Sequence, residues 1–190
     1  MKNIQISLSL VVAFAVLATQ VSSEQLRNED VLNAEAKAVV QQFAGRLKPT
    51  LKAAIQSGGL VHAIDVCATE APAIAAAVSA QTGWSIKRVS LKARNNSSAV
   101  PDEFERDILT QFDERQRRGE SASEINHSRL ADDEFRFMSA QGVEGLCLNC
   151  HGVALQPDVK QAIGARYPDD EATGYSLGQI RGAFSVSKRL

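Results

Sequence analysis

Apolar residues recur at helical spacing through the first part of the chain. Between residues 28 and 57 they return every three to five positions, which predicts an amphipathic helix that Pro49 bends and Gly58-Gly59 ends. The apolar positions of this stripe are Val31, Ala34, Ala38, Phe43, Leu47, Leu51 and Ile55. A second helix is predicted over residues 60–68, and a third to start with Thr69 as its N-cap, because Pro72 would not fit a helix interior.

Beyond Gly83 the pattern predicts strands and one clear helix. The predicted strands are 84–91, 125–130, 134–140 and 180–187, and the middle two form a hairpin around Asp132-Asp133. The helix runs over residues 101–118, with proline and acidic residues in its first turn and arginines in its last. Helices followed by at least four antiparallel strands, with helices between them, predict an α+β domain.

The strongest chemical signal is the pentad Cys147-Leu148-Asn149-Cys150-His151. The spacing C-x-x-C-H is typical of the attachment site of a c-type haem, because two thiols add to the two vinyl groups on one porphyrin edge and the histidine reaches the iron. The chain has only 3 Cys and 3 His, so this order does not arise readily by chance. We therefore predict one haem c, covalently attached to Cys147 and Cys150, with His151 as the proximal iron ligand.

The first 23 residues predict export. A basic tip, Met1-Lys2-Asn3, precedes an apolar run over residues 8–18, and small residues precede Glu24, as in a secretory signal peptide. The apolar run is shorter than the ~20 residues of a membrane span. Cleavage is expected after Ser23, which leaves residues 24–190 as one domain in the periplasm, and the alternative is an uncleaved anchor. Haem c is attached outside the cytoplasm, so the two signals agree.

Charge narrows the class of partner. The formal net charge is −1 at pH 7, with 21 basic and 22 acidic residues, which argues against nucleic acid and against an anionic membrane surface. No membrane span is expected in the mature chain. A redox or signalling protein is the expected partner, with a small gaseous ligand as a second one.

The residues alone leave the sixth iron ligand open. Small carrier cytochromes supply a methionine downstream of the motif, but none follows His151 here. Met138 is expected to pack in the core, on the face opposite Phe135 and Phe137, and His127 lies in a polar run that predicts an exposed side chain.

His62 and Cys67 lie on one predicted helix, but they point in different directions. They are five positions apart, about 140° around a helix, so they cannot both face one iron. Cys67 shares a stripe with Leu60 and Ile64 and therefore faces the interior, either as a small buried hydrophobe or as a thiolate on iron.

Other uses of C-x-x-C fit less well. A zinc site needs four ligands in tetrahedral geometry, and Cys150 and His151, which are adjacent in the chain, are poorly placed to bind the same zinc ion. A thioredoxin-like dithiol should follow a strand in a βαβ unit, which the pattern does not predict. A Cys147–Cys150 disulfide is the alternative for a chain without haem. A haem peroxidase needs an acid–base pair on an open distal side, which neither Cys67 nor His62 supplies, so no enzymatic activity is expected.

Six ordered stretches carry a family resemblance. They are residues 63–67 with Ala71-Pro72, residues 88–95 with Pro101-Asp102, and residues 147–152, 167–170, 172–175 and 181–186. Together they resemble the PAS-like single c-type haem domain, long catalogued as a domain of unknown function and found in exported proteins and in sensor regions of bacterial signalling proteins. The stretches extend from residue 63 to residue 186 of the mature chain, and Asn96 stands where the family has proline.

The resemblance implies a fold, a ligand set and two functions. The fold has N-terminal helices packed on a PAS-like antiparallel sheet, with the haem near the C-terminal part, and the iron is ligated by His151 and Cys67. The expected function is a haem-based redox or small-ligand sensor, and the alternative is a low-potential periplasmic electron-transfer cytochrome. Independently of the resemblance, the charge of Arg88, Arg94 and Arg181 and the turns beside them make these residues candidates for pairing with the haem propionates, and the alternative is that they are ordinary surface cations.

Overall fold

The structure, a computed structural model, describes the backbone of residues 8–190 and the side chains from Asn28 onward. It comprises two units, residues 1–35 and residues 36–190. The second unit holds the sheet and every site residue named above. The expected signal peptide over residues 1–23 and its cleavage after Ser23 lie outside the described side chains and stay predictions.

Helix α1 (Leu8–Thr82) consists of two helices that meet at Gly59. Gly59 has φ 76° and ψ −171°, in the region of positive φ that glycine reaches without a steric penalty. The predicted end of the first helix at Gly58-Gly59 is therefore confirmed. Within the described part of α1, Gly59 is the only residue with non-helical dihedral angles.

The predicted restart at Thr69 is wrong, because the helix after Gly59 continues through Pro72. Pro72 removes the N–H that would bond the carbonyl of Ala68, but its ring lies on the exposed side of the helix, where water can reach the freed carbonyl. The Thr69 hydroxyl does not cap a helix. It donates backwards to the carbonyl oxygens of Asp65 (3.3 Å) and Val66 (3.2 Å), within a helix that is already formed.

The buried face of the first helix differs in part from the predicted stripe. Its buried residues from position 36 on include Ala36, Val39, Phe43 and Leu47, whereas Ala38 is exposed. The predicted burial of Phe43 and Leu47 is confirmed, and the prediction that Ala38 belongs to the buried face is wrong. Several alanines follow one another in this segment, and their weak apolar character is compatible with more than one helical face.

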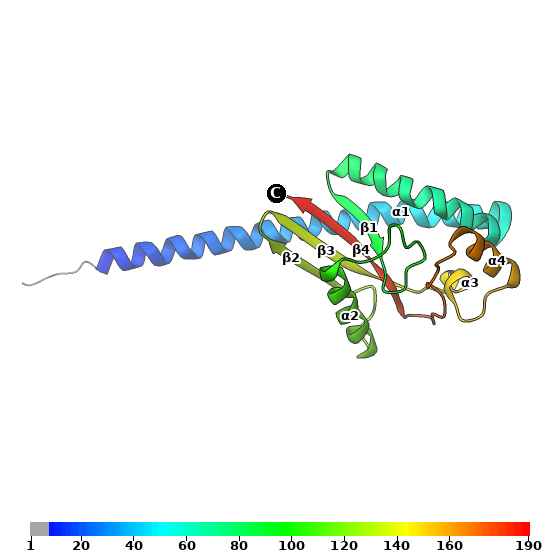
Figure 1. Cartoon of the computed structure of the whole chain (residues 1–190). Helices are drawn as coiled ribbons and strands as arrows, with labels where there is room; N and C mark the ends of the chain where they lie inside the picture. The colour runs from blue at the N-terminus through cyan, green and yellow to red at the C-terminus, as the bar shows by residue number, and fades with distance from the viewer. Residues whose placement is uncertain (1–7) are drawn as a thin grey trace, which may run out of the picture. The chain divides into compact units, whose positions relative to one another are not determined.

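Four strands form one antiparallel sheet in the order β1-β4-β3-β2 (Figure 1). They are β1 (Ser85–Val89), β2 (Asn126–Ala131), β3 (Glu134–Gly142) and β4 (Ile180–Arg189). The hairpin of β2 and β3 turns at Asp132-Asp133, and Asp132 adopts a positive φ of 54°. The predicted strands and the predicted hairpin are confirmed.

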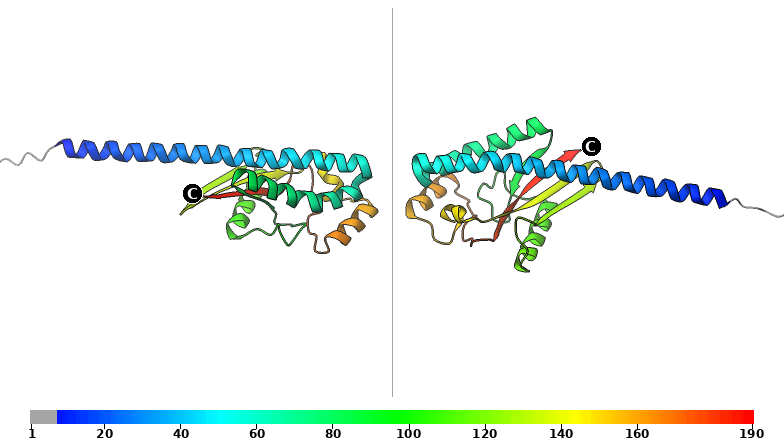
Figure 2. Two further views of the ribbon diagram at one scale, coloured as in Figure 1. Left: turned by 90° about the horizontal axis from the view of Figure 1, so that it is seen from above. Right: turned by 180° about the vertical axis from the view of Figure 1, so that it is seen from behind.

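Helices cover both faces of this sheet (Figure 2). On one face Phe43 of α1 contacts Phe184 of β4, with 5.8 Å between the ring centroids. On the other face α2 (Glu103–Arg117) packs Ile108 and Phe112 against a cluster that includes Met138. The central strand β4 is therefore buried along both sides, and the predicted α+β architecture is confirmed, with Met138 opposite the face of Phe135 and Phe137.

Helix α2 begins with a capping box that the predicted acidic first turn only partly anticipates. The Asp102 carboxylate accepts from the backbone N–H of Glu105 (2.8 Å), and the Glu105 carboxylate accepts from that of Asp102 (2.9 Å). Glu105 is fully buried and also binds Lys87 (2.9 Å), Arg136 (3.2 Å) and the Ser185 hydroxyl (2.6 Å). A buried carboxylate thus joins α2 to three strands of the sheet.

One helix is apolar enough to be compared with a membrane span. Among the residues with described side chains, the segment Asn28–Thr82 of α1 meets the length and composition of a spanning helix. The core helix of a globular domain meets the same criterion, and Phe43, Ala63, Ile64 and Val78 in this segment are buried within the protein. The expected absence of a span in the mature chain stays a prediction.

Candidate functional site

Two short helical turns present the C-x-x-C-H pentad. Cys147 ends η1 (Gly145–Cys147), and Cys150 and His151 end α3 (Leu148–His151). The two thiols lie about one helical turn apart, so they lie on neighbouring positions of one surface. Both are half-buried free thiols, as is Cys67. The alternative disulfide between Cys147 and Cys150 is not formed in the structure.

The His151 ring is held in one tautomer. Its Nδ1 lies 2.6 Å from the carbonyl oxygen of Ala172, so Nδ1 carries the hydrogen and donates it to that carbonyl. Burial first, and then the positive charges of Arg181 and Arg94, lower the pKa of His151 to about 2. The ring is therefore neutral, and its Nε2 has a lone pair available for a metal ion.

The nearest cation does not occupy the direction of that lone pair. Arg181 Nη1 lies 3.0 Å from Nε2 and 3.5 Å from Nδ1 of His151, almost equally far from both ring nitrogens. A donor on the Nε2 lone pair would be much farther from Nδ1, because that lone pair points in the ring plane away from Nδ1. The Arg181 guanidinium therefore lies over the ring and not along the Nε2 lone pair.

Arg94 ties three segments together around His151. Its guanidinium donates to the Cys150 carbonyl (2.5 Å), to the Ala172 carbonyl (3.2 Å) and to Asp170 Oδ1 (3.1 Å). Asp170 Oδ1 also accepts from the backbone N–H of Ala172 (3.0 Å). Arg94 thus positions the carbonyl that orients His151, and it is neither a surface cation nor a free partner for another anion.

Gly152 lets the following loop pack against the motif. A Cβ on this residue would lie 2.5 Å from the Leu148 carbonyl oxygen, so a side chain would force the end of α3 to move. The backbone N–H groups of Gly174 and Tyr175 donate to the carbonyls of Gly152 (3.0 Å) and His151 (2.9 Å). The loop that carries Ala172 is therefore fixed directly to the turn that carries His151.

Cys67 lies in the same charged environment as His151. Burial raises the pKa of the Cys67 thiol, and the positive charges of Arg88, Arg181 and Arg94 oppose that rise. The same three arginines lower the pKa of His151. Burial raises the pKa of Cys150, and the charge of Cys67 adds to that rise, so the thiol on α1 and the thiol of the motif are close enough to interact.

The helix around Cys67 faces the motif, as its apolar stripe predicts. Ile64, about one turn before Cys67, is buried in a cluster with Val159 and Ile163 of α4 (Pro157–Arg166), and Cys150 packs against this cluster. His62 is exposed and lies back against Gly58, on a different side of the helix. The predicted separation of His62 from Cys67 is confirmed.

The other predicted ligand candidates lie in a different layer. Met138 is fully buried in the core beneath α2, and His127 lies on the outer strand β2, 5.9 Å from the ring of Phe104. His127 is half-buried rather than exposed, and burial lowers its pKa. Among the residues with described side chains, no three His, Cys, Asp or Glu groups converge as a metal ion would need, so the alternative zinc site is not assembled there.

Two groups of the site carry no sequence signal of their own. Asp170 and the Ala172 carbonyl were not predicted to act on His151. A backbone carbonyl leaves no side-chain trace, and Asp170 is separated from its partner Arg94 by 76 positions. The only hint was that both lie in stretches that carry the family resemblance.

A family model described as Tll0287-like matches residues 18–188. The chain belongs to the Tll0287-like family. Among solved structures it is similar to the "Crystal structure of the cyanobacterial heme-protein Tll0287", with a TM-score of 0.61 and 22% identity over 86% of this chain and 95% of that chain. At that identity the likeness is one of fold, and this Tll0287-like chain has the predicted arrangement of helices and sheet. No curated protein matches it.

Proposed function

We propose that this Tll0287-like protein is an exported c-type haem protein, with one haem attached to Cys147 and Cys150 and His151 as the proximal ligand. The observation that carries the proposal is the state of His151, which is neutral, held through Nδ1 and not bound by Arg181 along its Nε2 lone pair, beside the two turns that carry the thiols. When bound, haem supplies an iron that exchanges one electron and can take a small sixth ligand.

The residues around His151 fit such a group. Arg94, Asp170 and the Ala172 carbonyl keep the imidazole oriented, as the outer hydrogen bonds of metal-binding histidines do. Arg88 and Arg181 are half-buried and form no ion pair with an acidic side chain in the described part of the chain. Burial lowers the pKa of both, to about 10 for Arg181. The two propionates of a haem would supply the missing carboxylates.

Cys67 is proposed as the sixth ligand. Its thiol is half-buried, and three guanidinium groups favour its thiolate form against the cost of burial. A metal ion deprotonates a coordinating thiol, so an elevated pKa in the metal-free site does not prevent coordination. The other candidates, Met138 and His127, lie in the α2 layer.

For the role of the site we propose a periplasmic redox or small-ligand sensor that acts through a redox or signalling partner. Thiolate binds ferrous iron less tightly than ferric iron, so reduction favours release of Cys67. The helix break predicted at Thr69 is absent, and the break in α1 lies about three turns earlier, at Gly59. Release would therefore involve the whole helix after Gly59 or the Cys67 side chain alone.

The continuous helix also favours the second candidate, a low-potential electron-transfer cytochrome. A helix without a break next to Cys67 holds the sulfur in one place. A carrier benefits from keeping both ligands in both oxidation states, because reorganisation at the metal slows electron exchange. No enzymatic activity is proposed for either role.

Carbon monoxide distinguishes the two roles. The ferrous sensor is expected to bind it readily, with a shift of the Soret band and loss of the thiolate features, because Cys67 leaves the iron. A visible spectrum of the reduced protein with and without the gas measures this. In the Cys67→Ala control carbon monoxide should bind in any case, which shows that the gas reaches the iron. A wild-type ferrous protein that ignores saturating carbon monoxide would instead be an electron carrier.

A further inference from the structure

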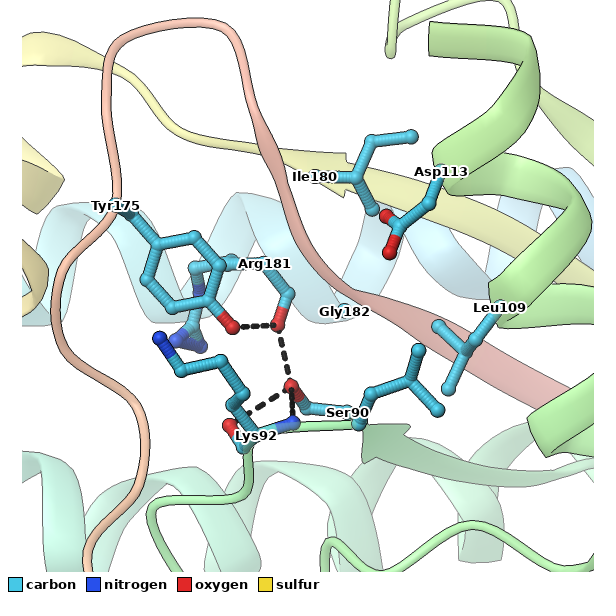
Figure 3. Close-up of a pocket in the computed structure, with 9 residues that line it drawn as sticks. Ser90, Lys92, Leu109, Asp113, Tyr175, Ile180, Arg181 and Gly182 are labelled. Atoms are coloured by element: carbon cyan, nitrogen blue, oxygen red, sulfur yellow. Dashed lines mark hydrogen bonds between the residues drawn. The ribbon is translucent and has the colours of Figure 1, made fainter. Parts of the chain in front are cut away.

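A small cavity lies between α2 and the start of β4 (Figure 3). Its wall includes Ser90, Leu109, Asp113, Tyr175, Ile180 and the backbone of Gly182. The cavity measures about 70 Å³, far below the ~300 Å³ at which pockets for nucleotide-sized or drug-sized ligands begin. It has room for a few water molecules or for a ligand of a few non-hydrogen atoms.

The two cations in the cavity wall are engaged elsewhere. The Lys92 ammonium lies 4.6 Å from the centre of the Tyr175 ring and donates to the Thr173 carbonyl. The guanidinium of Arg181 contacts His151, whereas the backbone carbonyl oxygen of Arg181 lies beside Ser90 and Tyr175 in the cavity wall. That oxygen accepts from the Ser90 hydroxyl (2.6 Å) and from the Tyr175 hydroxyl (3.4 Å). The polar groups on this side of the cavity therefore include the Ser90 and Tyr175 hydroxyls and the Arg181 carbonyl oxygen.

Asp113 is the one carboxylate of this wall, and it has no hydrogen-bond or ion-pair partner in the described part of the chain. In Figure 3 its carboxylate points from α2 toward the space bounded by Ser90 and Tyr175. Burial raises its pKa, and the charge of Arg117 opposes that rise. A half-buried carboxylate without a partner is a strong acceptor for a cation.

We propose that this cavity binds a small monovalent organic cation of the alkylammonium class. The ammonium group would bind the Asp113 carboxylate, and the alkyl part would lie against Leu109 and Ile180. A hydrated divalent ion suits the site less well, because it needs about six oxygen ligands and part of the wall is apolar. The site is separate from the haem site proposed above, although Arg181 and Tyr175 border both.

Thermal unfolding of the purified protein tests the proposal with methylammonium chloride as the probe. A ligand of two non-hydrogen atoms is expected to bind with a Kd on the order of 10 mM. At 100 mM it should raise Tm by about 3–6 °C at constant ionic strength. Tetramethylammonium, which has no N–H to donate and is larger, should raise Tm no more than sodium chloride does.

Variants on α2 provide the matched control. Asp113→Asn should abolish most of the methylammonium-induced shift in Tm, while Asp107→Asn, which removes an exposed carboxylate from the same helix, should retain it. Leu109→Phe, which fills the cavity, should also abolish the shift in protein that still unfolds cooperatively. Equal shifts for wild type and Asp113→Asn, equal shifts with sodium chloride, or no shift at 100 mM would each overturn the proposal.

Discussion

Replacing Cys67 with alanine is expected to convert a low-spin ferric spectrum with thiolate features into a high-spin spectrum with five ligands or with water as the sixth. The reduction potential should rise by about 60 mV or more, which is a tenfold change in the relative stabilities of the ferric and ferrous forms. The physical reason is that thiolate stabilises the higher charge of ferric iron. Visible and electron paramagnetic resonance spectra, with a redox titration, measure both effects.

His62→Ala is the matched control for Cys67→Ala. His62 lies on the same helix but is exposed and turned toward Gly58, so its removal should leave the spin state and the potential unchanged. A changed spin state in His62→Ala together with an unchanged one in Cys67→Ala would reverse the ligand assignment. Equal spectra for all three proteins would mean that neither residue binds the iron.

Glu105→Gln is expected to lower the free energy of unfolding by about 2–4 kcal/mol. The carboxylate is fully buried and accepts from Lys87, Arg136, Ser185 and the backbone of Asp102. The glutamine amide lacks the negative charge that stabilises the two cations. Its NH2 group is a donor, and it would face groups that are donors themselves. The Lys87 side chain is 43% exposed, so solvent screening keeps the loss below that of a wholly buried ion pair. Urea-induced unfolding measures the difference.

Glu103→Gln tests whether the loss belongs to the buried network. Glu103 lies in the same first turn of α2 but is exposed, so this variant should change stability by no more than about 0.5 kcal/mol. A loss of similar size in both variants would indicate that the charge near the helix N-terminus, rather than the buried contacts of Glu105, stabilises the fold.

Features that depend on local spacing could be predicted from the sequence. The hairpin at Asp132-Asp133, the helix α2 and the end of a helix at Gly58-Gly59 follow from turn residues and apolar periodicity, and the structure has all three. The motif of Cys147, Cys150 and His151 is likewise contiguous, so its recognition as a haem attachment signal required no knowledge of the tertiary structure.

Features that depend on tertiary packing could not be predicted in the same way. Pro72 lies inside a helix because its ring faces solvent and the rest of the helix is held by buried residues such as Ala71 and Val78. The face of α1 that carries Ala36 and Val39 is selected by the sheet, since alanines allow more than one face. The proximity of Arg94 to Asp170 joins two loops far apart in the chain, and no local pattern encodes it.

The mass of the mature protein tests the central claim most directly. Expressed with a competent cytochrome c maturation system and exported, the protein should carry the mass of one haem beyond that of residues 24–190, and the haem should stay attached after extraction with acidified acetone. Replacing either Cys147 or Cys150 with alanine should leave at most one thioether bond. A mass equal to that of the unmodified chain, with the haem colour lost to the organic phase, would contradict the account.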